Sequence, residues 1–537
     1  MLERALRASV GARLAPKRAY TRECRRAMSR PRAAPTRVSV GARLARDYRR
    51  AIVIIALAAA PLTSLAEPLA SPGDMRLRHD LQLLNDTGVI NIPLTAWPIA
   101  LGDIHNALAD ANTSDISAST KAAYVRVRNH LSWELDSDTV RYRIGLSAAE
   151  NSRVIRAFEY TPREEGEVSA GLNWLGERFA VNLAATYVSD PFDGDEIRPD
   201  GTYIGVALGN WMLMAGWQER WWGPGRDGSM ILSTNARPLP SVGIQRISSV
   251  PFETKWLSWM GPWTLTSFMG LFDDEREINN GLFWGLRGSF RPTRGLEIGL
   301  SRTAQWCGDD RPCDLKTFLR LLNGNDNQGA NVDPEDEPGN QLAGFDIRWT
   351  LPRQIPLALY LQWIAEDTQR TGFTFHLWLR QVGVEYWGSI GDVSHRMHFE
   401  VADSASRLGA VGQGAQSPNV AYNHFIFKTG YRYKGRSLGH SGDGDTLSYS
   451  IGSTLIQSAG HSWNISLRYM EINRLGAPDL RHSLTPTPQE LTDLQISHER
   501  HTKFGRFYAG LGYSRLDDEV SGTTSSDVTG FIQWSSN

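Results

Sequence analysis

Cysteine is nearly absent from this sequence, which has three in 537 residues. So few cysteines exclude a small secreted scaffold held together by several disulfides. Cys24 lies in an N-terminal segment that is expected to be removed, which leaves Cys307 and Cys313 in "CGDDRPC". In an oxidising compartment this pair favours a disulfide. Free thiols are the alternative, and a structural zinc ion would need more ligands than this short loop offers.

Long apolar runs are also missing. After Ala66 no stretch has the length and apolarity of a transmembrane helix. The apolar run at 51–60 follows two arginines and precedes the small residues of "SLA", which end at Ala66. This pattern is typical of a Sec-type signal peptide. Residues 1–66 are therefore predicted to be a signal peptide with a long basic n-region. The alternative, a membrane anchor, would need a longer run.

An excess of basic charge is missing from the chain that would remain after export. Of the 57 Lys and Arg residues, 15 lie in residues 1–66, against 3 of the 58 Asp and Glu residues. The rest of the chain is therefore acidic, although the formal net charge of the whole is -1. An acidic chain argues against nucleic acid as a partner.

Helical periodicity is confined to about residues 74–136. "DMRLRHDLQLLNDTG", "ALGDIHNALAD" and "STKAAYVRVRNHLSWEL" each place apolar residues at helical spacing. The third segment offers Ser119 or Thr120 as an N-cap. Three short helices joined by proline-containing loops predict a small helical bundle over residues 67–138.

From about Thr139 to the end the pattern changes to a period of two. "TLSYSIGSTL" alternates serines with larger apolar residues, and "FYAGLGYS" alternates aromatic and leucine residues with small ones. "TYIGVALGNWMLMAGW" predicts two strands joined by a tight turn at Gly209-Asn210. The alternation is not continuous between Asp392 and Thr446, so no register is predicted there.

This extent of strand narrows the fold class. About 400 residues of strand without intervening helices exceed a single β-sandwich, and the blade repeat of a propeller is missing. Aromatic residues near strand ends and small polar residues on the second face are typical of an outer-membrane barrel with a wet lumen. Residues 139–537 therefore predict a mainly β fold, a large antiparallel transmembrane β-barrel of about 16–18 strands.

One stretch, "QERWWGPGRDGSMILSTNARPLP", breaks the alternation. Adjacent tryptophans and a Gly-Pro-Gly turn are followed by loop-forming residues. Aromatic faces cover the C–H side of a sugar ring, while guanidinium, carboxylate and amide groups bind its polar groups. The alternative is a loop folded into the lumen whose polar groups satisfy one another. The candidate polysaccharide-binding residues are Trp221, Trp222, Arg220, Arg226, Asp227, Asn235 and Arg237.

Several motifs together resemble a known family. "RWWGPGRDGSMILSTNARPLP", "GPW", "RGLEIGLSRTAQWCGDDRPC", "PGNQLAGFDIRW", "PLALYLQW" and "GYRYKGRSLG" occur in this order, after the helical "LRHDLQLLNDTGVINIPLTAWPIALGDI". They are similar to the Wzi-type capsule-assembly proteins, and the resemblance runs from residue 74 to the last strand. It implies an outer-membrane barrel of about 18 strands with a helical bundle on the periplasmic side.

The resemblance also implies a function. Members of this family behave as lectins that hold exported capsular polysaccharide at the cell surface. Capsular polysaccharide, outer-membrane lipid and the capsule export machinery are the expected partners, and no cofactor or metal is expected. A porin or solute channel is the first alternative, because the same barrel with an open lumen would conduct.

An outer-membrane hydrolase is the second alternative. "GHSGD" at 439–443 approaches a nucleophile elbow, but Asp443 replaces the last glycine and the strand-turn-helix setting is missing. His398 and Glu400 share a strand face, which is too little for a metal site. No carboxylate pair has a spacing that singles it out for glycoside cleavage. The protein is therefore predicted not to be an enzyme.

Overall fold

The computed structural model describes residues 68–137, 139–273, 275–323, 339–352, 355–368, 375–408, 418–457, 460–475 and 479–536. The predicted signal peptide and Cys24 lie outside the described residues. None of the described helices has the length and apolarity to span a bilayer.

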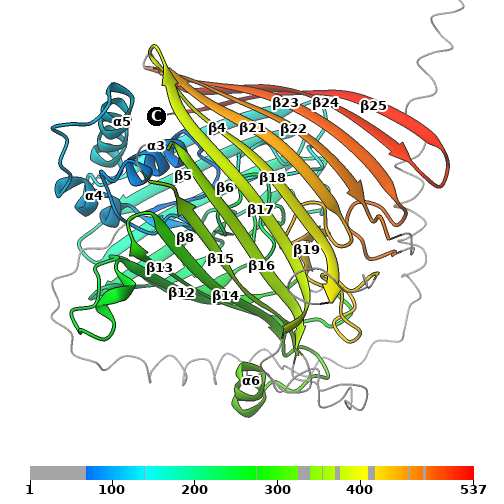
Figure 1. The fold of residues 1–537 in the computed structure, drawn as a ribbon. Coiled ribbons are helices and arrows are strands. Elements are labelled where there is room, and N and C mark those ends of the chain that lie inside the picture. The colour runs from blue at the N-terminus through cyan, green and yellow to red at the C-terminus, as the bar shows by residue number, and fades with distance from the viewer. Residues whose placement is uncertain are drawn as a thin grey trace, which may run out of the picture. The chain divides into compact units, whose positions relative to one another are not determined.

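A closed antiparallel β-barrel forms most of the described chain (Figure 1). The last strand, β25, pairs with the first, β4, which closes the ring. Strands β7 and β8 both pair with β6 and share one place in the wall, so the described residues form 18 strands. This confirms the predicted fold class. The wall consists of β4 (Arg141–Ala149), β5 (Gly166–Leu175), β6 (Phe179–Ser189), β7 (Ile197–Arg198), β8 (Tyr203–Leu208), β9 (Trp211–Gly216), β11 (Ser241–Arg246), β12 (Trp263–Leu271), β13 (Leu282–Thr293), β14 (Leu296–Trp306), β15 (Gly339–Thr350), β16 (Leu357–Thr368), β17 (Phe375–Ile390), β18 (Val393–Leu408), β21 (Leu447–Gln457), β22 (His461–Ile472), β23 (Gln489–Thr502), β24 (Gly505–Asp518) and β25 (Thr523–Ser535).

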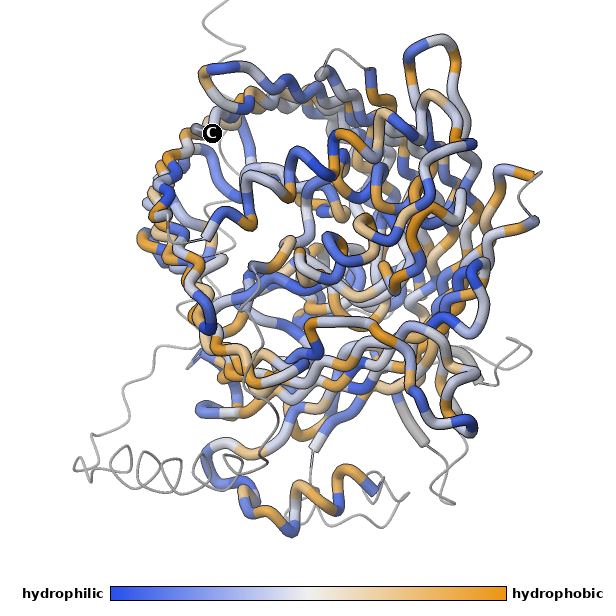
Figure 2. The backbone as a smooth tube through the Cα atoms, turned by 90° about the vertical axis from the view of Figure 1, so that its left-hand side faces the viewer, coloured by the Kyte–Doolittle hydropathy of each residue, from blue (hydrophilic) through white to orange (hydrophobic). Residues whose placement is uncertain are grey.

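The predicted alternation distinguishes the two faces of the wall. On β21, Ser448 and Ser450 are buried toward the lumen, whereas Tyr449 and Ile451 are exposed on the outside. The same holds along the wall, where large apolar side chains outside oppose polar ones inside. An apolar exterior around a polar interior is the pattern of a barrel that crosses a membrane. Figure 2 shows the wall as a ring around an interior that other parts of the chain occupy.

The connections differ at the two ends of the barrel. Short connections at 176–178, 209–210, 294–295, 391–392 and 503–504 share one end with the entry into β4 and the exit from β25. We call this the helical end, because three helices precede β4 there. Most long connections lie at the other end, which we call the loop end. The exception is 247–262, a long connection at the helical end that contains the 3-10 turn η1 (Ser258–Met260).

The three helices between residues 74 and 136 are α3 (Met75–Asp86), α4 (Leu101–Ala109) and α5 (Ala118–Glu134). Asp74 caps α3, and Ser117 caps α5, so the expected cap at Ser119 or Thr120 was wrong by two or three residues. Eleven of the 12 residues of α3 are buried. The helices do not stand apart from the barrel, because α3 enters the lumen.

Sequence periodicity missed short strands in the N-terminal segment and in the long connections. Two-residue strands pair β1 (Leu69–Ala70) with β3 (Ile99–Ala100), β2 (Ala96–Trp97) with β10 (Trp221–Trp222), and β19 (Arg432–Tyr433) with β20 (Arg436–Ser437). A fourth helix, α6 (Leu315–Leu322), contradicts the expectation that helices are confined to residues 74–136. Between Asp392 and Thr446, where no register was predicted, β18 comes first and the long connection to β21 follows it.

Candidate functional site

The loop at 217–240 turns into the lumen, where the alternation of β9 ends. Its residues Trp221 and Trp222 form β10 and pair with Trp97 and Ala96 of the N-terminal segment. Gly223 has a φ of 139°, and a Cβ there would lie 2.6 Å from the Gln362 amide. The turn therefore requires glycine both for its backbone and for its approach to β16. The loop and the N-terminal segment together cross the interior.

The adjacent tryptophans of this loop, Trp221 and Trp222, are fully buried. The Trp221 ring packs edge-on against Phe158 at 5.3 Å between centroids, and its Nε1 donates to the Gly225 carbonyl at 3.1 Å. The Trp222 ring packs against Phe268. Neither ring presents a free face on which a sugar could stack. Burial therefore argues for a packing role and against direct sugar contact by these two residues.

The charged candidates of the loop are also buried and paired. Arg226 contacts Glu385 through its guanidinium, and Asp227 pairs with Arg468 at 2.5 Å. The carboxylate of Glu400 accepts from the backbone amides of Arg226 and Gly228 at 2.9 and 3.0 Å. These pairs hold the loop to the wall, as the folded-in alternative predicts.

The remaining three candidates lie along the same loop. Asn235 donates to the Ser437 carbonyl at 2.9 Å, and the Arg220 guanidinium lies 3.9 Å from the centroid of Phe268. Arg237, nearest the loop end, pairs with Asp193, Asp195 and Asp200 at 2.7–2.9 Å. The structure thus brings all seven predicted residues together, but as parts of the packed interior.

Helix α3 completes the filling on one side of the lumen. Asp86 pairs with Arg348 at 2.7 Å and with Arg396 at 2.8 Å. Burial by itself would raise the pKa of Asp86, but these two guanidiniums outweigh it and lower the pKa. Glu385 bridges the same two arginines at 2.5 and 3.0 Å. A buried network of this kind fixes the helix in the barrel.

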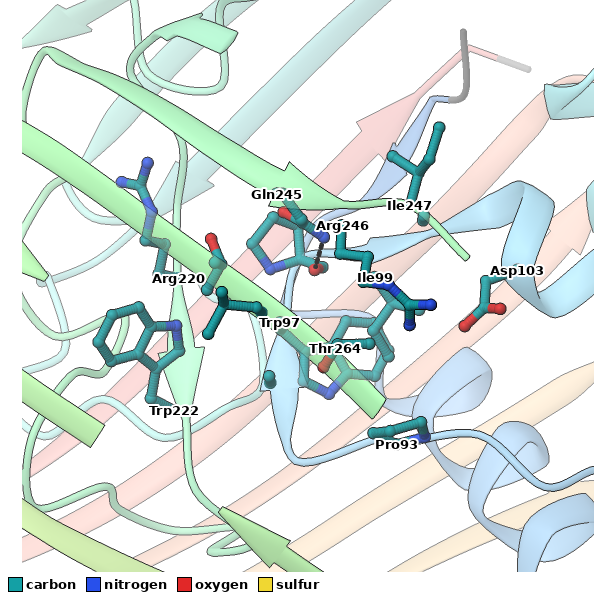
Figure 3. A pocket seen from close by; sticks show the side chains of 15 residues that line it. Pro93, Trp97, Ile99, Asp103, Arg220, Trp222, Gln245, Arg246, Ile247 and Thr264 are labelled. Atoms are coloured by element: carbon teal, nitrogen blue, oxygen red, sulfur yellow. Dashed lines mark hydrogen bonds between the residues drawn. The ribbon is translucent and has the colours of Figure 1, made fainter. Parts of the chain in front are cut away.

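A small cavity remains beside the N-terminal segment (Figure 3). It measures about 20 Å³, and Gln245 on its wall donates to the Pro98 carbonyl at 3.0 Å. Trp222 and Arg220 line the opposite side. Pockets for small molecules are on the order of 300–1,000 Å³. This cavity is therefore a packing gap rather than a ligand site.

A much larger cavity lies along the wall formed by β4–β8. Its volume is about 390 Å³, and residues 68–74 and the end of α5 close one side. Asn173, Asn182 and Thr186 line it from the wall, with Tyr160 and Glu219 from the loops. A cavity of this volume, with amide, hydroxyl and carboxylate groups around it, has the size and chemistry of a sugar site.

Two amide oxygens of this cavity have no partner. Asn173 Oδ1 and Gln533 Oε1 are buried, and neither accepts a hydrogen bond within the described residues. Buried polar atoms are nearly always paired, with protein, water or ligand. Both oxygens belong to side chains that line one cavity, and hydroxyl or amide donors of a ligand that reached them would satisfy them.

A pocket at the loop end adjoins this cavity, because Arg163 and Arg198 line both. Its own volume is about 10 Å³, so it could contact one group of a ligand held in the larger cavity but could not enclose a ligand by itself. It adds Arg156 and Arg436, whose guanidiniums donate only to backbone carbonyls and have no carboxylate partner among the described residues. Burial and the nearby charges of Arg163 and Arg436 lower the pKa of Arg156 to about 9. Glu164 and Asp193 also line this pocket, but its arginines and Lys434 outnumber them, which favours an anionic group.

An exposed aromatic ring completes this outer pocket. Phe192 is 60% exposed, and the Arg436 guanidinium lies 5.6 Å from its ring centroid. Phe192 therefore offers an exposed ring beside guanidinium groups, whereas Trp221 and Trp222 are buried. No local pattern predicts this set, although "GYRYKGRSLG" places Lys434 and Arg436 two residues apart. Phe192 lies over 200 residues earlier in the chain, so only the folded structure shows that it is close to Lys434 and Arg436.

Two of the residues considered for catalysis, Glu400 and Asp443, are paired within the protein. Glu400 also accepts from the Tyr360 hydroxyl at 2.8 Å and from Gln381 at 2.6 Å, so it clamps the inward loop. Asp443 of "GHSGD" pairs with Arg432 at 2.7 Å. Across the described residues, no group of three or more His, Cys, Asp or Glu side chains is arranged to hold a metal ion. The structure joins Cys307 and Cys313 in a disulfide at the loop end.

Comparison with known proteins gives consistent matches. The family model of the capsule assembly protein Wzi matches residues 137–524. An uncharacterised 55.8 kDa protein of the cps region of Klebsiella pneumoniae is 31% identical over 325 residues, which span 59% of this chain and 62% of that protein. The match thus covers less than two thirds of the relative.

The solved structure of Wzi from Escherichia coli has a similar fold. It is described as an outer-membrane protein involved in group 1 capsule assembly and as a carbohydrate-binding β-barrel. The TM-score is 0.75 at 26% identity, over 87% of this chain and 98% of that structure.

Proposed function

The chain belongs to the Wzi family of capsule assembly proteins, and on that premise we propose that it is a lectin that helps attach capsular polysaccharide to the cell surface. It is an outer-membrane protein with a β-barrel fold. The observation that carries the proposal is the polar cavity of about 390 Å³ with its unpaired acceptors, Asn173 Oδ1 and Gln533 Oε1. The related barrel from Escherichia coli is described as carbohydrate-binding.

We propose that the sugar binds in the cavity and the neighbouring outer pocket. We do not propose that it stacks on Trp221 or Trp222. One or two sugar units enter the cavity, and their hydroxyl groups donate to the two amide oxygens. Arg156 and Arg436 bind an acidic substituent of the chain, because guanidinium groups pair with carboxylates in a bidentate way. The polysaccharide is therefore expected to be acidic.

The orientation follows from the connections of the barrel. Bacterial outer-membrane barrels have short periplasmic turns and longer extracellular loops. The helical end is thus periplasmic and the loop end extracellular. Phe192 and Arg436 then lie on the side on which capsule accumulates, and Arg156 is buried in the same pocket.

We propose that binding is non-covalent and without catalysis. A lectin that cut its ligand would release the capsule that it retains. A channel is disfavoured because α3 and the loop at 217–240 occupy the described part of the lumen and are fixed there by buried ion pairs. Glu400 is hydrogen-bonded to the inward loop, and both Glu400 and His398 are buried within that interior.

Deletion of the gene in its encapsulated host tests this function. The amount of polysaccharide attached to cells is expected to fall while free polysaccharide in the medium rises, and the gene on a plasmid restores attachment. Unchanged attachment after deletion, with no increase in free polysaccharide, would contradict the proposal.

A further inference from the structure

Helix α6 lies on the outside of the barrel wall. It is contributed by the connection between β14 and β15, and Figure 1 shows it apart from the other helices, below the strands and outside the barrel. On β14, Thr303 and Gln305 face the lumen, where they contact the Tyr431 hydroxyl and the Gly430 carbonyl. Because successive residues of a strand point to opposite faces, Arg302 faces outward.

Arg302 fixes the end of α6 from this outer face. Its guanidinium donates to the carbonyls of Leu321 and Leu322 at 2.6 and 2.7 Å. These carbonyls belong to the last turn of the helix, and that of Leu321 also accepts from Gln341 at 2.9 Å. The helix is therefore docked on the side of the wall that faces lipid.

Aromatic packing holds the middle of α6 against the same face. The Phe318 ring packs on Trp284 of β13 at 5.6 Å and on Trp306 of β14 at 4.9 Å between centroids. Trp306 points outward with Arg302, since they are four residues apart on one strand. Outward tryptophans near strand ends form the aromatic girdle of a membrane barrel. The helix thus sits at the level of the girdle, at the loop end.

The start of the helix is also fixed. Asp314 accepts from the Thr317 backbone amide at 2.7 Å as an N-cap, directly after the disulfide between Cys307 and Cys313. With both ends and the middle held, the direction of the uncovered side chains is defined.

Two leucines of this docked helix are left uncovered. Leu315 is 72% exposed and Leu319 is 49% exposed, and their spacing of four residues puts them on one face. Leu300 and Leu271, on the outward faces of β14 and β12, are 56% and 44% exposed. The exposed leucines of α6 therefore continue the apolar surface that the wall presents to lipid.

We propose that α6 is an interfacial helix that binds the outer leaflet of the membrane. Leu315 and Leu319 enter the hydrocarbon at the level of the aromatic girdle. Lys316 and Arg320, on the same helix, extend along it to the phosphate headgroups, as long basic side chains do at interfaces. The partner is a lipid with acyl chains and a phosphate headgroup, and the inference is independent of sugar binding.

Spin labelling of the full-length protein in lipid bilayers tests the placement. A label at L319C, in a C24S background with the native disulfide intact, is compared with labels at L300C and L480C. Leu300 marks the lipid-facing wall, and Leu480 is a leucine of a loop-end connection that is 84% exposed. The label at 319 is expected to be accessible to oxygen and protected from a water-soluble nickel complex, as at 300. Accessibility like that at 480 would overturn the proposal.

The headgroup contact is tested separately with K316Q/R320Q in the L319C protein. Adding anionic phosphatidylglycerol to phosphatidylcholine bilayers is expected to increase the protection of the label at 319, and the double substitution is expected to abolish this increase. An increase of the same size in both proteins would overturn the headgroup contact. The label at 480 controls for general effects of the lipid and is expected not to respond.

Discussion

The two sides of the lumen differ in how their polar groups are satisfied. On the side of β15–β18, Arg348, Arg396 and Glu385 pair with α3 and with the inward loop. On the side of β4–β8, a cavity of about 390 Å³ remains, and Asn173 and Gln533 leave acceptors unpaired. Both sides are polar, so composition alone does not distinguish them.

The difference separates packing from binding. Paired, buried charges hold the helix and loop in place, and removing one partner leaves the other uncompensated. Unpaired buried acceptors reduce stability, and a ligand that supplies donors to them offsets that cost. Substitutions on the paired side should therefore change stability, and substitutions on the open side should change binding.

The largest effect is expected from D86A. The substitution removes the carboxylate that pairs with Arg348 and Arg396, so two buried guanidiniums lose a partner. Breaking a buried pair costs about 3–5 kcal/mol, and we expect about 5 kcal/mol here. Urea unfolding in detergent, followed by protease cleavage within α3, measures the loss. D110A, at the exposed end of α4, is the matched control, and equal stability of the two variants would refute the packing role of Asp86.

A somewhat smaller loss is expected from W221A. The ring is fully buried against Phe158, and truncating a buried tryptophan costs about 3–5 kcal/mol, of which we expect about 4. The same unfolding experiment checks this against W133A, which removes a tryptophan that is 53% exposed on α5. Folded W221A should bind polysaccharide as the parent does. Unchanged stability together with lost binding would instead make Trp221 a sugar platform.

Residue periodicity predicted the wall because local rules decide it. The alternation of Ser448 and Ser450 with Tyr449 and Ile451 gives a strand with one face toward lipid. The tight turn at Gly209-Asn210 and the first three helices follow equally from spacing and turn chemistry. These features depend on neighbours in sequence.

The cavity could not be predicted, because its residues come from distant parts of the chain. Asn173 and Gln533 are over 350 residues apart and meet only because β25 closes on β4. The burial of Trp221 likewise depends on its contacts with Trp97 and Phe158, and both residues are distant from it in the sequence. Helix α6 did carry a local signal: Asp314 as a cap and leucines at helical spacing.

The smallest change in stability, and the most direct test of the account, is expected from N173L/Q533L. Neither side chain makes a hydrogen bond within the described protein, so the free energy of unfolding should change by less than about 1 kcal/mol. Calorimetric titration of the purified protein with oligosaccharide fragments of the host capsule measures the affinity. N151L, an exposed amide outside the cavity, is the matched control.

Two lost hydrogen bonds of about 1 kcal/mol each predict roughly thirtyfold weaker binding by N173L/Q533L. N151L should bind as the parent protein does. Equal affinities of the parent and N173L/Q533L would contradict the claim that the open side of the lumen is the polysaccharide site.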